Sequence, residues 1–375
     1  MRDEGKLGVV LTGGGARAAY QVGFLRCLAE LAPEFRVPIV TGVSAGAINA
    51  VFLAAHTGTA REAADALTEL WSGLSPEKVF NIDPWCLART AMRWGLGLFS
   101  GGHAGGSSMR GLLDTAPLRA VLQGALEDEN GTIPGIGRNL ASGRLESLAV
   151  TTLNYGTGQT MTWVQGDEIE SWIRPQRLGI STEIQARHIM ASSALPMLFP
   201  AEELAGGWYG DGGIRFLTPL APAIHLGADR ILAVSTRYDR TLEEASCPMV
   251  TGYPPPAQIL GALLNAVFLD SVDQDAQRLE RVNGLLGGEP RGNLKPIKLL
   301  ILRPSEDLGH LAGEYEVDLP RAFRFVMRGL GTQRTSSPDF LSLLMFQSDY
   351  LRRLIEIGEA DAEARIDEIK ELMGP

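Results

Sequence analysis

The chain has 375 residues, 45% of them hydrophobic and 21% charged, so it can bury a large core, and disorder is excluded as its main state. Its net charge of −10 opposes nucleic-acid binding, and it opposes adsorption to anionic lipid by charge alone. Three cysteines without CxxC spacing indicate neither a disulfide framework nor a zinc site, and they favour a reducing, cytoplasmic compartment.

The N-terminal region alternates between strand and helix patterns. Short apolar runs predict buried strands at 7–11 and 37–41, and helical spacing of apolar residues predicts helices at 16–31, 47–56 and 60–71. This alternation predicts a parallel sheet with right-handed crossovers.

Residues 81–110 differ in composition from their surroundings. They combine Trp85, Trp94 and Phe99 with six glycines. We expect a mobile insertion, and its aromatic residues fit two roles equally well. They could form a lid or lipid-contacting surface, which would allow peripheral membrane contact, or they could pack in the core.

The rest of the chain continues the α/β pattern. Further strands are expected at 148–153, 161–164, 231–235 and 299–302, and further helices at 182–193, 217–226, 258–286 and 351–373. Because the strands are short, apolar and spread over the whole chain, they indicate one sheet and one core. The last helix has an apolar stripe that favours packing on the domain, or on a second copy of the chain, over a membrane.

The sequence contains no segment that predicts insertion into a membrane. Its first 15 residues lack the apolar stretch of a cleavable signal peptide, and no run of about 18 uncharged apolar residues occurs. We therefore expect neither a cleavable signal nor a spanning helix. Secretion by a route without a cleavable signal stays open.

A glycine-rich turn, Gly13–Arg17, lies between the first strand and the first helix. Successive glycines present bare N–H groups, and the helix that follows adds the positive end of its dipole. Such a turn suits a phosphate or a developing oxyanion, and it also occurs as a plain connection without a ligand.

A second turn, Gly42–Gly46, has the Gly-x-Ser-x-Gly pattern and also lies between a strand and a helix. In a nucleophile elbow, small neighbours permit a strained turn that exposes the serine hydroxyl. Ser44 is therefore a candidate nucleophile; the alternative is that it caps the following helix.

The sequence offers a carboxylate but no well-placed imidazole to activate this serine. Asp211, followed by Gly212 and Gly213, ends a short apolar run, a context in which an aspartate is often only a turn residue. For the five histidines we expect ordinary surface or core roles: His56, His103, His188, His225 and His310.

In their order, these three motifs resemble those of the patatin-like phospholipases. The segment Asp114–Leu118, the segment Ala191–Pro196 and the pair Phe199 and Pro200 match that family's pattern between the serine and the aspartate. The resemblance covers about residues 5–236. One departure is Ala18, where the family usually has the last glycine of its first motif.

The resemblance implies a three-layer α/β/α fold with a mostly parallel central sheet, and a helical C-terminal extension. It also implies a Ser–Asp dyad in which Ser44 is the nucleophile and Asp211 the base. The N–H groups of Gly14 and Gly15, with that of Gly13, would hold the oxyanion, and Arg17 would brace this turn or add positive charge near it.

The implied activity is hydrolysis of a phospholipid, a lysophospholipid or another acyl-ester lipid through an acyl-enzyme, with no cofactor or metal. The glycine turn formally fits a nucleotide-binding pattern, but the acidic residue expected after the second strand is missing. A non-catalytic lipid-binding protein of the same fold is the other alternative. We expect a catalytic core at 5–236, a remaining core strand and helices at 237–375, and a possible homo-oligomer.

Overall fold

The computed structural model of the chain describes residues 5–31, 37–81, 110–127, 131–167 and 171–374, together with residues 83, 85, 89, 92, 96, 100 and 169. The predicted insertion at 81–110 falls mostly outside these ranges. Trp94, Phe99 and His103 belong to the part that is not described.

The fold is built on one ten-stranded mixed sheet, whose main strand order is β10-β9-β1-β2-β3-β4-β6-β5. Strands β10, β9, β1, β2 and β3 are parallel, whereas β4 pairs with β3 in the antiparallel sense. Strand β8 also pairs with β3 in the antiparallel sense, at the residues of β3 that follow those paired with β2. The strands are β1 (Leu7–Leu11), β2 (Ile39–Val43), β3 (Ser147–Asn154), β4 (Thr160–Gly166), β5 (Trp172–Arg174), β6 (Arg177–Ser181), β7 (Glu202–Leu204), β8 (Gly207–Asp211), β9 (Arg230–Val234) and β10 (Lys298–Leu302).

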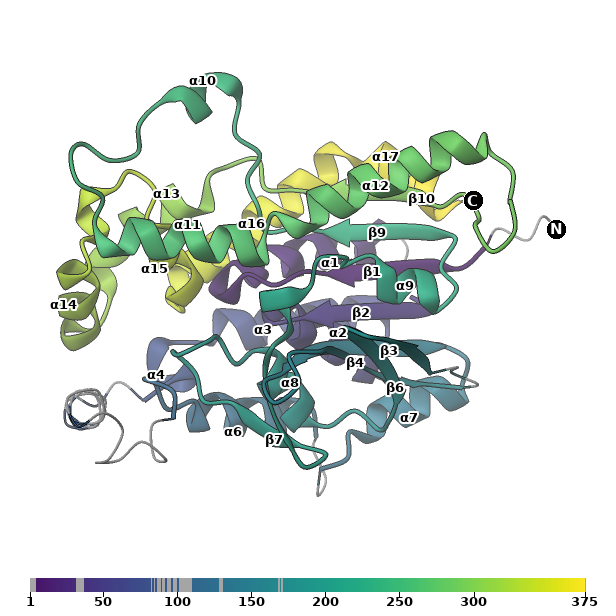
Figure 1. Ribbon diagram of the computed structural model, residues 1–375, viewed down its shortest axis with the longest axis horizontal. Helices are drawn as coiled ribbons and strands as arrows, with labels where there is room; N and C mark the ends of the chain where they lie inside the picture. The colour runs from purple at the N-terminus through teal and green to yellow at the C-terminus, as the bar shows by residue number, and fades with distance from the viewer. Residues whose placement is uncertain are drawn as a thin grey trace.

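Helices cover both faces of this sheet (Figure 1). They are α1 (Ala19–Leu31), α2 (Ala45–Ala55), α3 (Ala60–Ser72), α4 (Pro76–Val79), α6 (Ala116–Ala125), α7 (Pro134–Ala141), α8 (Ala186–Ser192), α9 (Ala221–His225), α10 (Leu242–Ser246), α11 (Pro256–Phe268), α12 (Ser271–Leu286), α13 (Leu308–Glu314), α14 (Arg321–Gly329), α15 (Asp339–Leu344), α16 (Ser348–Ala364) and α17 (Ile366–Met373).

Successive residues of the central strands point into two separate cores, as the alternation of a strand requires. In β1, Val9 and Leu11 contact the larger core, which includes residues of α1, α2 and α16, whereas Val10 contacts a smaller core with α9 and α12. The expected three-layer α/β/α fold is therefore confirmed. These strands are buried on both faces, which is why they read as continuous apolar runs rather than alternating ones.

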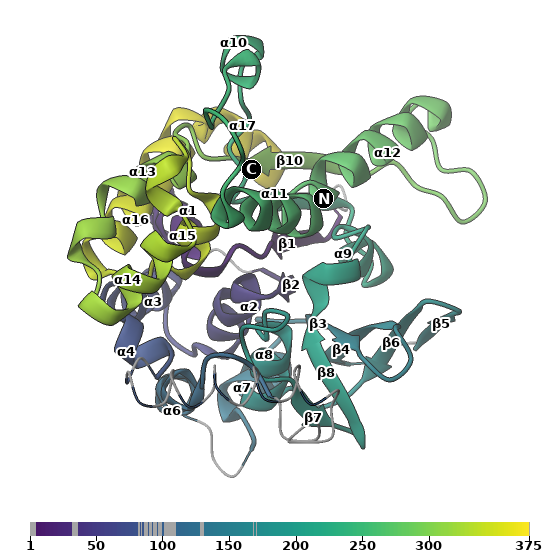
Figure 2. The same cartoon turned by 60° about the vertical axis from the view of Figure 1, so that its left-hand side comes forward.

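Two helices that were predicted as continuous are each broken in two. The predicted helix 258–286 consists of α11 and α12, which separate at Leu269 and Asp270, and Figure 2 shows α12 extending away from the body of the molecule. The predicted helix 351–373 breaks at Arg365, whose guanidinium donates a hydrogen bond to the carbonyl oxygen of Ile301 in β10. At Arg365 a tertiary contact, which periodicity cannot reveal, accompanies the break.

The C-terminal region belongs to the same core as the first helix. Helix α16 lies against α1 at two glycines: a Cβ on Gly23 would lie 1.9 Å from the carbonyl oxygen of Ile355, and one on Gly358 would lie 2.0 Å from that of Tyr20. Among the described residues, none forms a helix with the length and apolar character needed to cross a membrane.

Candidate functional site

Ser44 occupies a strained turn between β2 and α2. Its φ of 55° and ψ of −134° lie in a region that side-chain-bearing residues rarely adopt. The turn can be this tight only because its neighbours lack side chains: a Cβ on Gly46 would lie 2.3 Å from the carbonyl oxygen of Leu11, and one on Gly42 would lie 2.6 Å from the Cβ of Ala50. The strained turn between small neighbours agrees with the expected nucleophile elbow, but Ser44 is only 2% exposed, so its side chain lines the apolar pocket described below and is not exposed to solvent as expected.

Hydrogen bonds from the end of α8 hold the backbone of this turn. The amide N–H of Ser44 donates to the Ser192 Oγ at 2.9 Å, and the Ser193 hydroxyl donates to the carbonyl oxygen of Ser44 at 3.1 Å. The Ser192 hydroxyl in turn donates to the carbonyl oxygen of Thr151 in β3 at 2.7 Å. Sequence reasoning did not assign these serines a role, although both belong to the segment that matched the family pattern.

The register of β3 brings Asp211 next to Ser44. Thr151 is the partner of Val43, the last residue of β2, and Thr152 is the partner of Asp211, the last residue of β8. Strands β2 and β8 therefore meet along one edge of β3, and their ends bring the serine and the aspartate together although 167 positions separate them in sequence.

The Asp211 carboxylate is completely buried and only partly hydrogen-bonded. Its Oδ1 accepts a hydrogen bond from the Gly213 amide at 2.8 Å, whereas its Oδ2 has no hydrogen-bond partner among the described residues. Burial raises the pKa of Asp211 to about 7, and the Ser44 hydroxyl and the Gly213 amide oppose that rise. Near neutral pH this group can therefore both take and release a proton.

Glycines beyond Asp211 keep the turn compact. A Cβ on Gly212 would lie 2.4 Å from the carbonyl oxygen of Thr151, and one on Gly213 would lie 2.3 Å from the ring of Phe268. The Asp211 amide also donates to the carbonyl oxygen of Ala194 at 3.0 Å. The segment 192–194 thus holds both the serine turn and the aspartate turn.

The glycine-rich turn lies directly against Ser44. A Cβ on Gly13 would lie 2.9 Å from the Cβ of Ser44, and Gly14 and Gly15 have φ values of 150° and 55° that favour glycine. The Thr236 hydroxyl fixes this turn through a 2.8 Å hydrogen bond to the carbonyl oxygen of Gly13. Within the described residues, the amide N–H groups of Gly13, Gly14 and Gly15 donate no hydrogen bond to the backbone.

The Arg17 side chain forms a buried ion pair with α15. Its Nη2 lies 2.5 Å from the Asp339 Oδ1, and its Nε donates to the Ser342 Oγ at 2.6 Å. Both partners belong to α15, and Leu343 of the same helix lies so close to Gly15 that a Cβ there would be 2.2 Å from the Leu343 carbonyl oxygen. Arg17 was expected either to brace the glycine-rich turn or to add positive charge near it, and these contacts favour bracing of the turn. No local sequence signal pointed to Asp339.

A chain of buried hydrogen bonds links this turn to α3. The Trp71 Nε1 donates to the Asn49 Oδ1 at 2.7 Å, the Asn49 Nδ2 donates to the Gln21 Oε1 at 2.9 Å, and the Gln21 Nε2 donates to the carbonyl oxygen of Thr12 at 2.8 Å. Because these polar groups satisfy one another in the core, they fix the relative positions of α1, α2 and α3.

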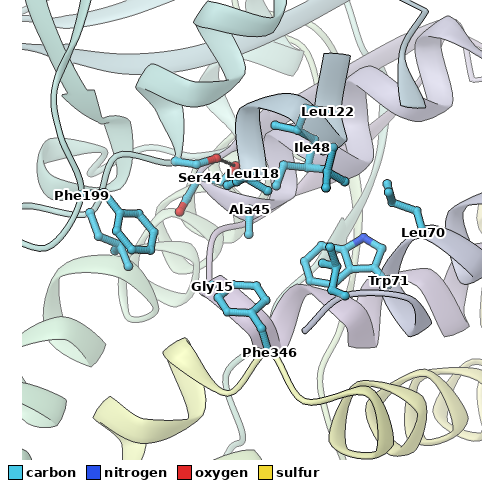
Figure 3. A pocket seen from close by; sticks show the side chains of 14 residues that line it. Gly15, Ser44, Ala45, Ile48, Leu70, Trp71, Leu118, Leu122, Phe199 and Phe346 are labelled. Carbon is cyan, nitrogen blue, oxygen red and sulfur yellow. Dashed lines mark hydrogen bonds between the residues drawn. The ribbon is translucent and has the colours of Figure 1, made fainter. Parts of the chain in front are cut away.

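A narrow apolar pocket lies beside Ser44 (Figure 3). Its walls come from α2, α3, α6 and two aromatic side chains that lie far apart in sequence. The lining residues are Gly15, Ser44, Ala45, Ile48, Leu70, Trp71, Leu74, Leu118, Val121, Leu122, Ser193, Leu195, Phe199 and Phe346. Almost all of the lining is apolar, which is the character of a site for a hydrocarbon chain rather than for a polar ligand.

The described histidines take no part in lining this pocket. His188 contacts the ring of Trp163, and burial lowers its pKa to about 4, so it is neutral at physiological pH. His225 stacks on Trp172. In the described part of the chain no group of three His, Cys, Asp or Glu side chains has the arrangement of a metal site.

Comparison with known proteins identifies the relatives of this chain. The family model described as patatin-like phospholipase matches residues 9–224, more than half of the chain and all three of the predicted motifs. No curated protein sequence gives a significant match.

Two solved structures illustrate the structural likeness. Human GIVD cytosolic phospholipase A2, in complex with a methyl gamma-linolenyl fluorophosphonate inhibitor and terbium chloride, is 16% identical with a TM-score of 0.46, and the match covers 99% of this chain and 59% of that one. VipD from Legionella pneumophila is 15% identical with a TM-score of 0.35, and the match covers 80% and 61%.

The chain spans about three fifths of the length of these two proteins. Because both TM-scores lie below 0.5, the assignment rests on the family model, which spans the serine elbow, the glycine-rich turn and the aspartate turn. On that match, the chain belongs to the patatin-like phospholipase family.

Proposed function

We propose that this protein hydrolyses acyl-ester lipids with Ser44 as the nucleophile and Asp211 as its base. The observation that carries the proposal is the meeting of three features at one point. A strained serine lies next to a buried carboxylate, beside glycine amides that donate no hydrogen bond to the described backbone, and at the wall of an apolar pocket.

In the proposed reaction, the Ser44 Oγ attacks the ester carbonyl carbon while its proton passes to the Asp211 carboxylate. The carbonyl oxygen becomes an oxyanion, which the N–H groups of Gly14 and Gly15, with that of Gly13, would stabilise. When the tetrahedral intermediate collapses, the ester bond to the alcohol breaks and the alcohol leaves with the proton from Asp211. An acyl-enzyme remains on Ser44.

The second half of the reaction repeats these transfers with water. Asp211 takes a proton from the water that attacks the acyl carbon, and it returns that proton to the Ser44 Oγ as the fatty acid leaves. A pKa of about 7 suits both directions, because the group must accept and then release a proton in every turnover. No step needs a metal or a cofactor.

The pocket supports a substrate with a long hydrocarbon chain. Leu70, Val121 and Leu122 would contact the acyl chain while the headgroup stays outside. A phospholipid or lysophospholipid is the substrate class that we favour, with other acyl-ester lipids as further candidates.

The end of the second strand argues against nucleotide binding. The second strand ends at Val43 and is followed by Ser44, so the acidic residue that would bind a ribose after this strand is missing.

Substitution of the two reactive groups tests the proposal. We expect Ser44→Ala and Asp211→Asn each to lower the hydrolysis of a soluble short-chain ester by at least about 10³-fold without loss of the fold. The rates of the purified proteins and their far-UV circular dichroism would be measured, with fatty acid identified as a product on phospholipid. If Ser44→Ala retains most of the activity, the proposed mechanism is wrong.

A further inference from the structure

Helix α14 carries an exposed surface unlike the rest of this acidic protein. Its sequence, RAFRFVMRG, contains three arginines and no acidic residue, whereas the whole chain has a net charge of −10. Phe323 and Met327 face the core, while Phe325 and Val326 are 80% and 45% exposed. The helix therefore buries one apolar face and leaves a second set of apolar side chains in water.

Arginines surround the exposed phenylalanine. On the helix surface Arg321 and Arg328 lie one turn to either side of Phe325, and Arg324 precedes it. Arg328 is paired with the buried carboxylate of Glu316, and Arg324 donates to the carbonyl oxygen of Val317. Neither Arg321 nor Arg324 has a carboxylate partner among the described residues.

A second exposed apolar residue extends this surface. Val317, which is 57% exposed, lies in the turn before the helix. We define the α14 surface as Val317, Arg321, Arg324, Phe325 and Val326. The exposed carboxylate of Asp318 lies beside it, and the arginines outnumber that carboxylate.

The buried face of α14 is connected through Phe80 to the wall of the apolar pocket beside Ser44. Phe323 contacts Phe80 with a ring-centroid distance of 5.2 Å, and Phe80 in turn contacts Phe199 and Phe346, which both line the pocket. In Figures 1 and 2, α14 lies beside α4 at the edge of the molecule. A contact made by Phe325 would therefore form on the outer side of the aromatic wall beside Ser44.

We propose that the α14 surface binds bilayers that contain anionic phospholipid. The apolar side chains would enter the interface while the arginines contact phosphate and carboxylate headgroups. Charge complementarity favours an anionic bilayer as the partner. The α14 surface is basic, whereas the net charge of −10 on the whole chain would repel such a membrane. This inference rests on the proposed function, because a lipid hydrolase takes its substrate from a bilayer. The binding experiment that tests it does not require catalysis.

Vesicle sedimentation with the Ser44→Ala protein tests the proposal, because this background cannot consume the lipid. Vesicles would contain phosphatidylcholine alone or with about 30% phosphatidylserine. We expect binding at least about tenfold tighter with phosphatidylserine. We also expect a loss of about fivefold for Arg321→Gln and of about tenfold for Phe325→Ser.

Two matched variants serve as controls. Arg281→Gln removes one exposed arginine from α12, and Ile173→Ser removes an isoleucine that is 82% exposed on β5. Both should bind vesicles as the parent does, and all variants should share its melting temperature. If Arg321→Gln and Phe325→Ser also bind like the parent, or if the parent does not bind, the proposal is overturned.

Two further measurements separate the remaining explanations. Analytical ultracentrifugation without vesicles would reveal whether Phe325→Ser dissolves a dimer, which would assign the surface to a second copy and overturn the membrane proposal. Hydrolysis of a soluble ester by the Ser44-containing protein tests the proposed function independently. Binding without hydrolysis would refute only the function, and hydrolysis without binding would refute only the α14 surface.

Discussion

At the scale of single residues, the site depends on a carboxylate whose properties come from burial. Asp211 is fully buried, and one of its oxygens has no hydrogen-bond partner among the described residues. Water and hydrogen bonds normally stabilise the charged form, so their removal raises its pKa to about 7. An ordinary aspartate, with a pKa of about 3.9, would be a much weaker base toward the Ser44 hydroxyl.

The elevated pKa predicts the pH dependence of hydrolysis. The proposed base, Asp211, would act only when it is deprotonated, so kcat/KM on a soluble ester should reach half its maximum near pH 7 and fall about tenfold per pH unit below that. The profile should be unchanged in His188→Gln. A profile that loses its inflection when any one histidine is replaced would show that an imidazole is the base.

The same burial predicts a cost in stability. Because the folded pKa lies above the value of the unfolded chain, the folded state binds more protons between about pH 4 and 7, and its stability falls as the pH rises through that window. Removing the charge with Asp211→Asn should therefore raise the free energy of unfolding at pH 8, by on the order of 4 kcal/mol at most. Urea unfolding of both proteins at pH 5 and pH 8 checks this. A stability difference that does not grow with pH would contradict it.

At the scale of elements, helix α15 holds the glycine-rich turn from the C-terminal part of the chain. Asp339 and Ser342 bind the Arg17 side chain, and the Leu343 backbone lies against Gly15. Because the Gly15 amide is a proposed oxyanion donor, the position of α15 should affect the transition state more than substrate binding.

We expect Asp339→Asn to lower kcat by at least about tenfold with less than a threefold change in KM. The variant should also lower the melting temperature, since it leaves the Arg17 charge buried without its carboxylate. Asp349→Asn, which breaks an exposed pair with Arg352, is the matched control and should change neither property. Similar losses in both variants would show that α15 does not position the turn.

At the scale of the whole molecule, the pocket combines residues from distant parts of the chain. Trp71 comes from α3, Leu122 from α6, Phe199 from the segment before β7, and Phe346 from the turn between α15 and α16. The wall of this pocket therefore exists only when the N-terminal region and the C-terminal helices pack together.

Narrowing this pocket should discriminate by chain length. Val121 lines it from α6 and is only partly buried, so Val121→Trp can fill the space without a large change in the core. We expect hydrolysis of a long-chain ester to fall at least about tenfold, and that of a short-chain ester less than threefold. Leu294→Trp, at a position 56% exposed, is the control. If both esters are affected equally, this pocket does not bind the acyl chain.

Local sequence determined the parts of the protein whose geometry depends on neighbouring residues. The run Leu7–Leu11 forms the predicted strand because each of its residues is apolar and buried. The Gly42–Gly46 turn is tight because Gly42 and Gly46 leave no space for a side chain. The order of the three motifs was enough to indicate the family that the family model confirms. The three candidate groups could therefore be named without a structure.

Only the tertiary structure decided how those groups are held. The pairing of Thr151 and Thr152 with two different strands brings Ser44 and Asp211 together, and no residue near either one encodes that register. The same is true of the Arg17–Asp339 pair, whose members are 322 positions apart, and of the breaks in the two long helices. Such contacts depend on how separate elements pack, which local residue patterns cannot specify.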